Sequence, residues 1–370
     1  MANQRTLHPI LLALPLLPIL CVYGISQFPD FIETYYAQKM YPPLSQYLRV
    51  ASGWLPVSVG DVFYFLLVLF LFIQIFFLIK NLRKKQLALA EKLRPLIRIS
   101  VSISILYLCF YLLWGLNYYR KGIADQLELR KDGTYATQEL LALNSDLLQI
   151  INQLRIHPDF NKQIFPSREA MFKEAAASYQ NLSHHFNFLG YRSVSLKPTL
   201  YGRLGNYGGF LGYYNPFTGE GQVNTTCPYF LQPFITCHEI AHQIGYASES
   251  EANFIGFLAT THSQNIYMQY SGHLEMYLYA SGKLRQTDSN LVKSLNQQLH
   301  PLVKKDLKEY KAYLQAHETI LQDWTNVLFD LFLKSNHQQQ GIYSYKDVVG
   351  WAIAYRKKFG SWLKKKTDNR

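Results

Sequence analysis

The chain has 370 residues, enough for about two domains, and only 17% of them are charged while 15% are aromatic. This composition excludes a disordered chain, because enough apolar surface is present to build a core. The net charge of +12 does not indicate a nucleic-acid partner, since seven basic residues lie in one short stretch, residues 80–98, between two apolar runs.

The first predicted elements are three membrane-spanning helices, at about residues 9–28, 62–79 and 99–118. Each apolar run is close to the roughly 20 residues that a helix needs to cross a bilayer. The first run is also compatible with a signal peptide, but no A-x-A-like cleavage site follows it, so we predict a retained span. Residues 1–119 are therefore predicted to form a membrane domain whose partner is the lipid bilayer.

The basic stretch predicts the orientation of the chain, because loops rich in Lys and Arg stay in the cytoplasm. Residues 29–60 and residues 120–370 then lie outside, which predicts an integral protein of the cell membrane with an extracytoplasmic domain. Trp114, Tyr118 and Tyr119 are predicted to anchor the outer end of the third span at the membrane interface. The outer segment before the second span mixes aromatic residues and prolines, and predicts short helices that lie on the membrane or against the extracytoplasmic domain.

The extracytoplasmic domain is predicted to be α+β and mostly helical, with a small sheet. Helical periodicity marks residues 137–154 and 167–184. Residues 192–225 are instead rich in Gly, Tyr and β-branched residues, which predicts short strands with a tight turn at residues 215–219. Helices resume near Pro233 and continue towards the C-terminus.

The strongest functional signal is the motif His238-Glu239-Ile-Ala-His242. Two His residues four apart lie on the same face of a helix, where their imidazoles can share a Zn²⁺ ion. Glu239 is then placed to act as the general base on a water whose pKa the zinc lowers towards about 7. Pro233 suits the start of this helix and Gly245 suits its end.

Two carboxylates compete for the place of third metal ligand, Glu249 and Glu251. Ser248 and Glu251 have the spacing of a capping box, which gives Glu251 a structural role at a helix start. Glu249 has no such role, and Asn253 lies one turn beyond it, where its side chain can hydrogen-bond a ligand. We therefore favour Glu249 and keep Glu251 as the alternative.

These residues carry a resemblance to known families. HEIAHQIGYASESEANFIGFLA resembles the active-site segment of gluzincins, zinc peptidases with a Glu ligand on a following helix that typically reads E-x-x-x-D. Glu249 and Asn253 match that spacing, with Asn in place of Asp. The chain more closely resembles an uncharacterised bacterial family of membrane-anchored proteins, a domain of unknown function with the features of zinc peptidases, through WGLNYYR, GYYNPFTGEGQVN, the HExxH segment and GIYSYKDVV.

The resemblance implies a zincin-like fold and, in zincins, a strand before the HExxH helix that pairs with extended substrate. Residues 212–214 and 222–224 are the two candidates, and a purely structural hairpin is the alternative. We predict a zinc-dependent metallopeptidase that acts on a peptide or protein. Two alternatives remain open: a zinc-binding regulatory membrane protein with little turnover, and a zinc amidohydrolase that acts on cell-wall peptides.

Overall fold

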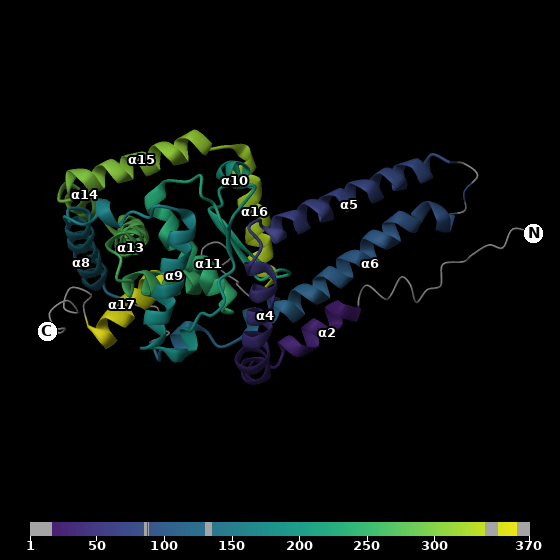
Figure 1. Ribbon diagram of the computed structural model, residues 1–370, viewed down its shortest axis with the longest axis horizontal. Coiled ribbons are helices and arrows are strands. Elements are labelled where there is room, and N and C mark those ends of the chain that lie inside the picture. Colours follow the sequence, from purple (N-terminus) through teal and green to yellow (C-terminus); the bar gives the residue numbers. More distant parts are fainter. Residues whose placement is uncertain (1–16, 85–86, 88, 130–134, 337–346, 361–370) are drawn as a thin grey trace, which may run out of the picture.

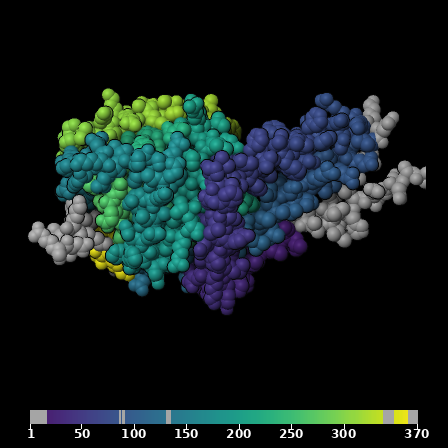
Figure 2. Space-filling view, in the orientation of Figure 1, coloured from purple at the N-terminus to yellow at the C-terminus, as the bar shows by residue number. Residues whose placement is uncertain are grey.

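The protein is mostly helical and contains one small sheet, as the sequence predicted. The computed structural model describes residues 17–84, 87, 89–129, 135–336 and 347–360. A helical body encloses the sheet, and two long antiparallel helices leave this body side by side (Figure 1). In the space-filling view this pair forms a ridge that projects from the body, with α4 lying across the junction (Figure 2).

The projecting pair consists of α5 (Val59–Leu82) and α6 (Leu89–Leu113). Within the described residues, these are the helices long and apolar enough to cross a membrane, and only 6% of the residues in the apolar window of each are buried. They correspond to the second and third predicted spans. The second span begins three residues before and ends three residues after its predicted bounds. The third begins about ten residues early, with Lys92 and Arg94 inside the helix, and ends at Leu113 rather than at residue 118.

The first predicted span is represented by α2 (Leu17–Ser26), a helix of ten residues that packs against α6. Its predicted residues 9–16 lie outside the described residues. Within the described residues, two helices are long and apolar enough to cross a membrane, where the sequence predicted three spans.

The chain between α2 and α5 packs against the body. Its elements are α3 (Pro29–Phe31), the π-helix η2 (Ile32–Met40) and α4 (Tyr41–Gly53). The side chains of Tyr36 and Tyr41 are buried in a small apolar cluster with Trp114 and Tyr214. Of the two predicted positions for this segment, packing against the domain is therefore confirmed.

The start of α5 is fixed to the sheet by polar contacts. Ser58 caps the helix by accepting a hydrogen bond from the Asp61 N–H at 3.0 Å. The Glu220 carboxylate accepts hydrogen bonds from the Val59 and Gly60 N–H groups, at 3.1 and 2.5 Å. A carboxylate at a helix N-terminus satisfies free N–H groups and complements the helix dipole. The direction in which α5 leaves the body is set by these contacts.

The sheet has three strands in the order β1–β3–β2: β1 (Leu196–Pro198), β2 (Gly212–Asn215) and β3 (Glu220–Val223). The β1–β3 pair is parallel and the β2–β3 pair is an antiparallel hairpin. Gly219 ends the hairpin turn with φ of +71°, a conformation that favours glycine, so the predicted turn is confirmed. A short helix that the sequence did not predict, α10 (Gly202–Gly208), interrupts the strands.

Helices cover the sheet and form the main core. The predicted helices at 137–154 and 167–184 are confirmed as α8 (Thr137–Arg155) and α9 (Arg168–Ser183). The longer helices after the sheet are α11 (Gln232–Gln243), α12 (Glu249–Thr261), α13 (Ile266–Thr287), α14 (Ser289–Gln297), α15 (Pro301–His317), α16 (Ile320–Ser335) and α17 (Asp347–Phe359). The short elements are η3 (Gly115–Tyr119), α7 (Ile123–Gln126), η4 (Asn161–Gln163), η5 (Asn187–Leu189) and η6 (Tyr229–Leu231). Helices α8, α9, α11, α12, α13 and α17 pack around one continuous apolar cluster, with α11 and α12 at its centre.

Candidate metal centre

The HExxH motif lies on α11, whose limits follow the local sequence. Pro233 occupies the first turn, where a missing N–H costs nothing. Gly245 follows the helix with φ of +95°, and its N–H donates to the His242 carbonyl at 3.1 Å. The 3.6-residue period places His238 and His242 on one face, with their ring centroids 4.7 Å apart. The predicted helix start and stop are both confirmed.

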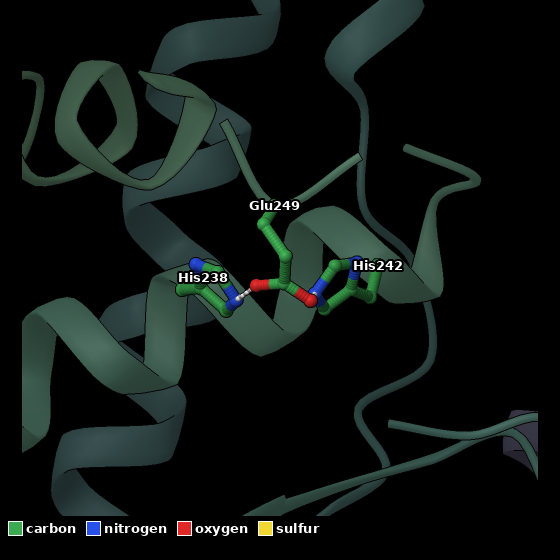
Figure 3. Close-up of side chains that lie close together, drawn as sticks. All are labelled: His238, His242 and Glu249. Atoms are coloured by element: carbon green, nitrogen blue, oxygen red, sulfur yellow. Dashed lines mark ion pairs between the residues drawn. The ribbon is translucent and has the colours of Figure 1, made fainter. Parts of the chain in front are cut away.

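Glu249, the first residue of α12, places its carboxylate between the two imidazoles (Figure 3). Its two oxygens lie 3.3 Å from His238 Nε2 and 3.5 Å from His242 Nε2. One donor atom from each of the three residues lies within 4.8 Å of the other two. Two nitrogens and one oxygen that converge in this way could hold a metal ion, and catalytic zinc sites commonly use three protein ligands of these types.

The other nitrogen of each imidazole is already engaged, which fixes the tautomer. His238 Nδ1 donates to the Asn253 side-chain oxygen at 2.8 Å, and His242 Nδ1 donates to the Tyr246 carbonyl at 2.7 Å. Because Nδ1 already donates to a protein oxygen, Nε2 is the nitrogen of each imidazole that faces Glu249, and it could bind a metal once it gives up its own proton. The expected role of Asn253 as a hydrogen-bond partner of a His is confirmed.

Electrostatics keep Glu249 ionised although it is buried. Burial alone raises the pKa of a carboxyl, but the adjacent imidazoles of His242 and His238 outweigh it and hold the pKa of Glu249 well below its usual range. An ionised carboxylate next to two imidazole nitrogens suits a cation at this point.

Glu239 lies beside the cluster and faces the sheet. The residue is 2% exposed, and burial raises the pKa of its carboxyl to about 8. Its Oε2 is buried and has no hydrogen-bond partner among the described residues. A Cβ atom at Gly212 would overlap Glu239 Oε1, and one at Gly221 would lie 3.1 Å from the Glu239 Cβ. Two glycines of the hairpin therefore make room for this carboxylate.

The N-terminal third of the chain supports α11 from behind. The Trp114 indole N–H donates to the His242 carbonyl at 3.0 Å. The Gln243 carbonyl accepts from Tyr41, Ser45 and Arg49, at 2.9, 2.5 and 3.0 Å. These donors satisfy carbonyls that the end of a helix leaves unpaired.

One prediction for this region is wrong. Trp114 does not anchor the chain at a lipid interface, because it is 5% exposed and packs against His242 and Tyr214. Trp114 belongs to the segment WGLNYYR, one of those that carried the family resemblance. The carbonyl that accepts its hydrogen bond lies 128 residues further along the chain, so the sequence alone did not reveal this contact.

The argument that chose Glu249 over Glu251 used a capping box, and that capping box is absent. Ser248 makes no side-chain cap hydrogen bond, and its hydroxyl lies 2.9 Å from Ser250 Oγ instead. Glu251 accepts a hydrogen bond from the Ile123 N–H at 2.6 Å. Glu251 therefore binds backbone far away in sequence, and it is Glu249 that joins the His cluster.

The candidate ligands open into a cavity of 1370 Å³. Of the two strand candidates for substrate pairing, only β2 has a free edge within the described sheet, because β3 is paired on both sides. Tyr118, predicted to be an interfacial anchor, lines the cavity together with Tyr213 and Tyr214. Tyr246, whose direction the sequence left open, points away and donates to the Gln126 side chain at 2.5 Å.

Comparison with known proteins identifies the family of this chain. A family model described as "Protein of unknown function (DUF3810)" matches residues 36–353. The chain belongs to this family. The DUF3810 match begins in η2 and ends in α17, so it includes the α5–α6 hairpin as well as the body. Neither the curated proteins nor the solved structures contain a match to the chain.

Proposed function

We propose that this protein is a membrane-anchored, zinc-dependent metallopeptidase with a zincin-like arrangement of its site. The observation that carries the proposal is the convergence of His238 Nε2, His242 Nε2 and the Glu249 carboxylate beside a buried Glu239. Three further features support it: the hydrogen bonds at Nδ1 of both His side chains, the lowered pKa of Glu249, and the buried Glu239 oxygen that has no hydrogen-bond partner among the described residues.

The residues fit a zinc ion and divide the chemistry among them. Zn²⁺ bound by this donor set supplies a Lewis acid that polarises a carbonyl and acidifies water. Glu239 accepts the proton of the attacking water and later delivers it to the leaving amine. The free edge of β2 aligns an extended peptide alongside Glu239, whose Oε1 closely approaches Gly212.

We also propose that α5 and α6 cross the cell membrane and that the body lies outside the cytoplasm. The length and apolar surface of both helices support the crossing. The basic residues between and within them, including Arg83, Lys84 and Lys92, support a cytoplasmic connection.

The purified protein is expected to contain about one zinc per chain, because the site offers three protein ligands and one open position. His242→Ala should abolish stoichiometric zinc, measured by elemental analysis after dialysis. His184→Ala is the matched control, since His184 is exposed and follows α9, remote from the cluster in sequence. Full zinc content in His242→Ala would reject the metal site.

Gly212→Ala is expected to lower hydrolysis by about 100-fold with zinc retained, because misplacing a catalytic group by about 1 Å has that effect. The added methyl group would overlap Glu239 Oε1 and approach the Gln222 carbonyl at 3.0 Å. Gly282→Ala is the control, because a Cβ atom there meets no atom within 4 Å. The measurement is turnover of a peptide library together with zinc content, and equal turnover in the two variants would contradict the placement of Glu239.

A further inference from the structure

The cavity extends well beyond the candidate ligands and reaches the projecting helices. Tyr64, Phe65 and Val68 of α5 form part of its wall, and Phe110 of α6 adds another part. Positions 64, 65 and 68 share one face of a helix. The face of α5 that turns towards the site is therefore a wall of the cavity, while Phe72, one turn further on, is 67% exposed and does not line it.

Helix α16 forms the wall near the base of the hairpin (Figure 1). Phe329 and Phe332 line the cavity, and the Phe332 ring lies 6.0 Å from that of Phe110. The other face of α16 is also apolar but points outwards. Its exposed large side chains are Ile320, Leu321, Trp324, Val327, Leu328 and Leu331.

The exposed face of α16 continues the apolar surface of the hairpin. A helix that presents large apolar residues to its surroundings beside membrane-spanning helices has the character of an interfacial helix, which rests in the headgroup region. The cavity is lined by the early turns of α5 and the last turns of α6, the ends of the hairpin that join the body, and the proposed topology puts these ends at the membrane surface.

The charges of the cavity restrict what it binds. Among the described residues that line it, no Lys or Arg is present, and the acidic ones are Glu239, Glu249 and Glu275. Glu275 is 7% exposed and makes no hydrogen bond or ion pair with any described residue. The absence of Lys and Arg from this wall removes the usual partners of a lipid phosphate, and its many apolar and aromatic side chains favour an apolar group.

We propose that this cavity binds an apolar peptide segment that reaches it from the membrane. The substrate class is then the membrane-proximal part of a membrane-embedded polypeptide rather than a soluble peptide. The inference rests on the proposed function for what happens to the bound segment, but not for the binding itself. The anchoring of Val59 and Gly60 to Glu220 keeps the α5 wall in place before a substrate arrives.

The test compares two photoreactive peptides, with the full-length Glu239→Gln protein, loaded with zinc, in phosphatidylcholine vesicles. One peptide carries an apolar membrane-spanning segment, and the other has that segment replaced by Gly and Ser. Covalent capture is measured after illumination, so that no hydrolysis is required. We expect capture of the apolar peptide well above that of the soluble one.

Two further variants locate the binding site on α5. Val68→Trp fills the cavity wall and is expected to reduce capture of the apolar peptide about tenfold. Phe72→Trp places the same side chain one turn further along α5, where the helix does not line the cavity, and should leave capture unchanged. Thermal unfolding of both variants verifies that the fold is intact.

The outcomes separate this inference from the proposed function. Equal capture of the two peptides, or equal capture by the two Trp variants, overturns the inference whether or not the protein hydrolyses anything. Capture that is lost only in Val68→Trp supports it even if the wild-type protein cleaves no peptide. Hydrolysis of soluble peptides without capture of the apolar one leaves the peptidase proposal standing and rejects the membrane route.

Discussion

Replacing Glu239 with Gln is expected to leave about one zinc per chain and to reduce peptide hydrolysis by about 10²–10⁴-fold, the usual contribution of a general base. Glu239 is not one of the three converging ligands, so the donor set of His238, His242 and Glu249 stays complete. Gln has nearly the same shape, which preserves packing against the hairpin glycines, but it cannot accept the proton of the attacking water. The measurement is zinc content and turnover on a peptide library.

Glu251→Gln is the matched control for this experiment. It makes the same exchange at another buried carboxyl, and the amide oxygen still accepts the hydrogen bond from the Ile123 N–H. Turnover should therefore remain near that of the wild type. Undiminished turnover in Glu239→Gln would refute the mechanism, and an equal loss in both variants would point to a general loss of structure.

Local sequence was sufficient to predict the centre of the site. The distance between the imidazoles of His238 and His242 follows from helical geometry, and the ends of α11 follow from Pro233 and Gly245. The two predicted helices before the sheet and the hairpin turn at Gly219 depend on periodicity and turn residues within a few positions. These interactions join residues only a few positions apart, so they can be predicted from a single sequence.

Long-range contacts could not be predicted in the same way. The choice of Glu249 gave the residue that joins the cluster, but the reason was wrong, because Glu251 bonds the backbone of Ile123 rather than forming a capping box with Ser248. Trp114 has the composition of an interfacial anchor, and only its distance to the His242 carbonyl reveals its structural role. The predicted third span also began too late and left out Lys92 and Arg94. A helix can extend beyond its apolar part into charged residues, which hydropathy alone does not show.

The site extends over parts of the chain that the sequence placed in different domains. Predictions assigned residues 1–119 to the membrane and residues 120–370 to the catalytic domain. In the structure, Tyr41, Ser45 and Arg49 hold the end of α11, and the α5 wall faces the same cavity as Glu239. A hydrophobic pattern shows that a helix is apolar, but it does not distinguish a side chain that faces lipid from one that lines a cavity.

The remaining prediction concerns the roles of Glu249 and Glu251. Glu249→Ala is expected to weaken zinc binding by more than about 100-fold, because losing even an outer hydrogen-bond partner of a ligand costs about 10–100-fold. Asn253→Ala removes such a partner of His238 and should fall within that lower range. The measurement is zinc affinity by competition with a chelator.

Glu251→Ala should change zinc affinity little and should instead destabilise the fold. It leaves the buried Ile123 N–H without its acceptor, which costs roughly 1–3 kcal/mol. Thermal unfolding of the apo protein measures this loss. Glu249→Ala removes the partner of His238 and His242 and therefore also lowers apo stability, so zinc affinity is the readout that separates the two variants. Loss of zinc in Glu251→Ala with retention in Glu249→Ala would reverse the two roles. Retention of full affinity in both variants would mean that the third ligand comes from another part of the chain, in which case the gluzincin-like arrangement fails while the two His ligands stand.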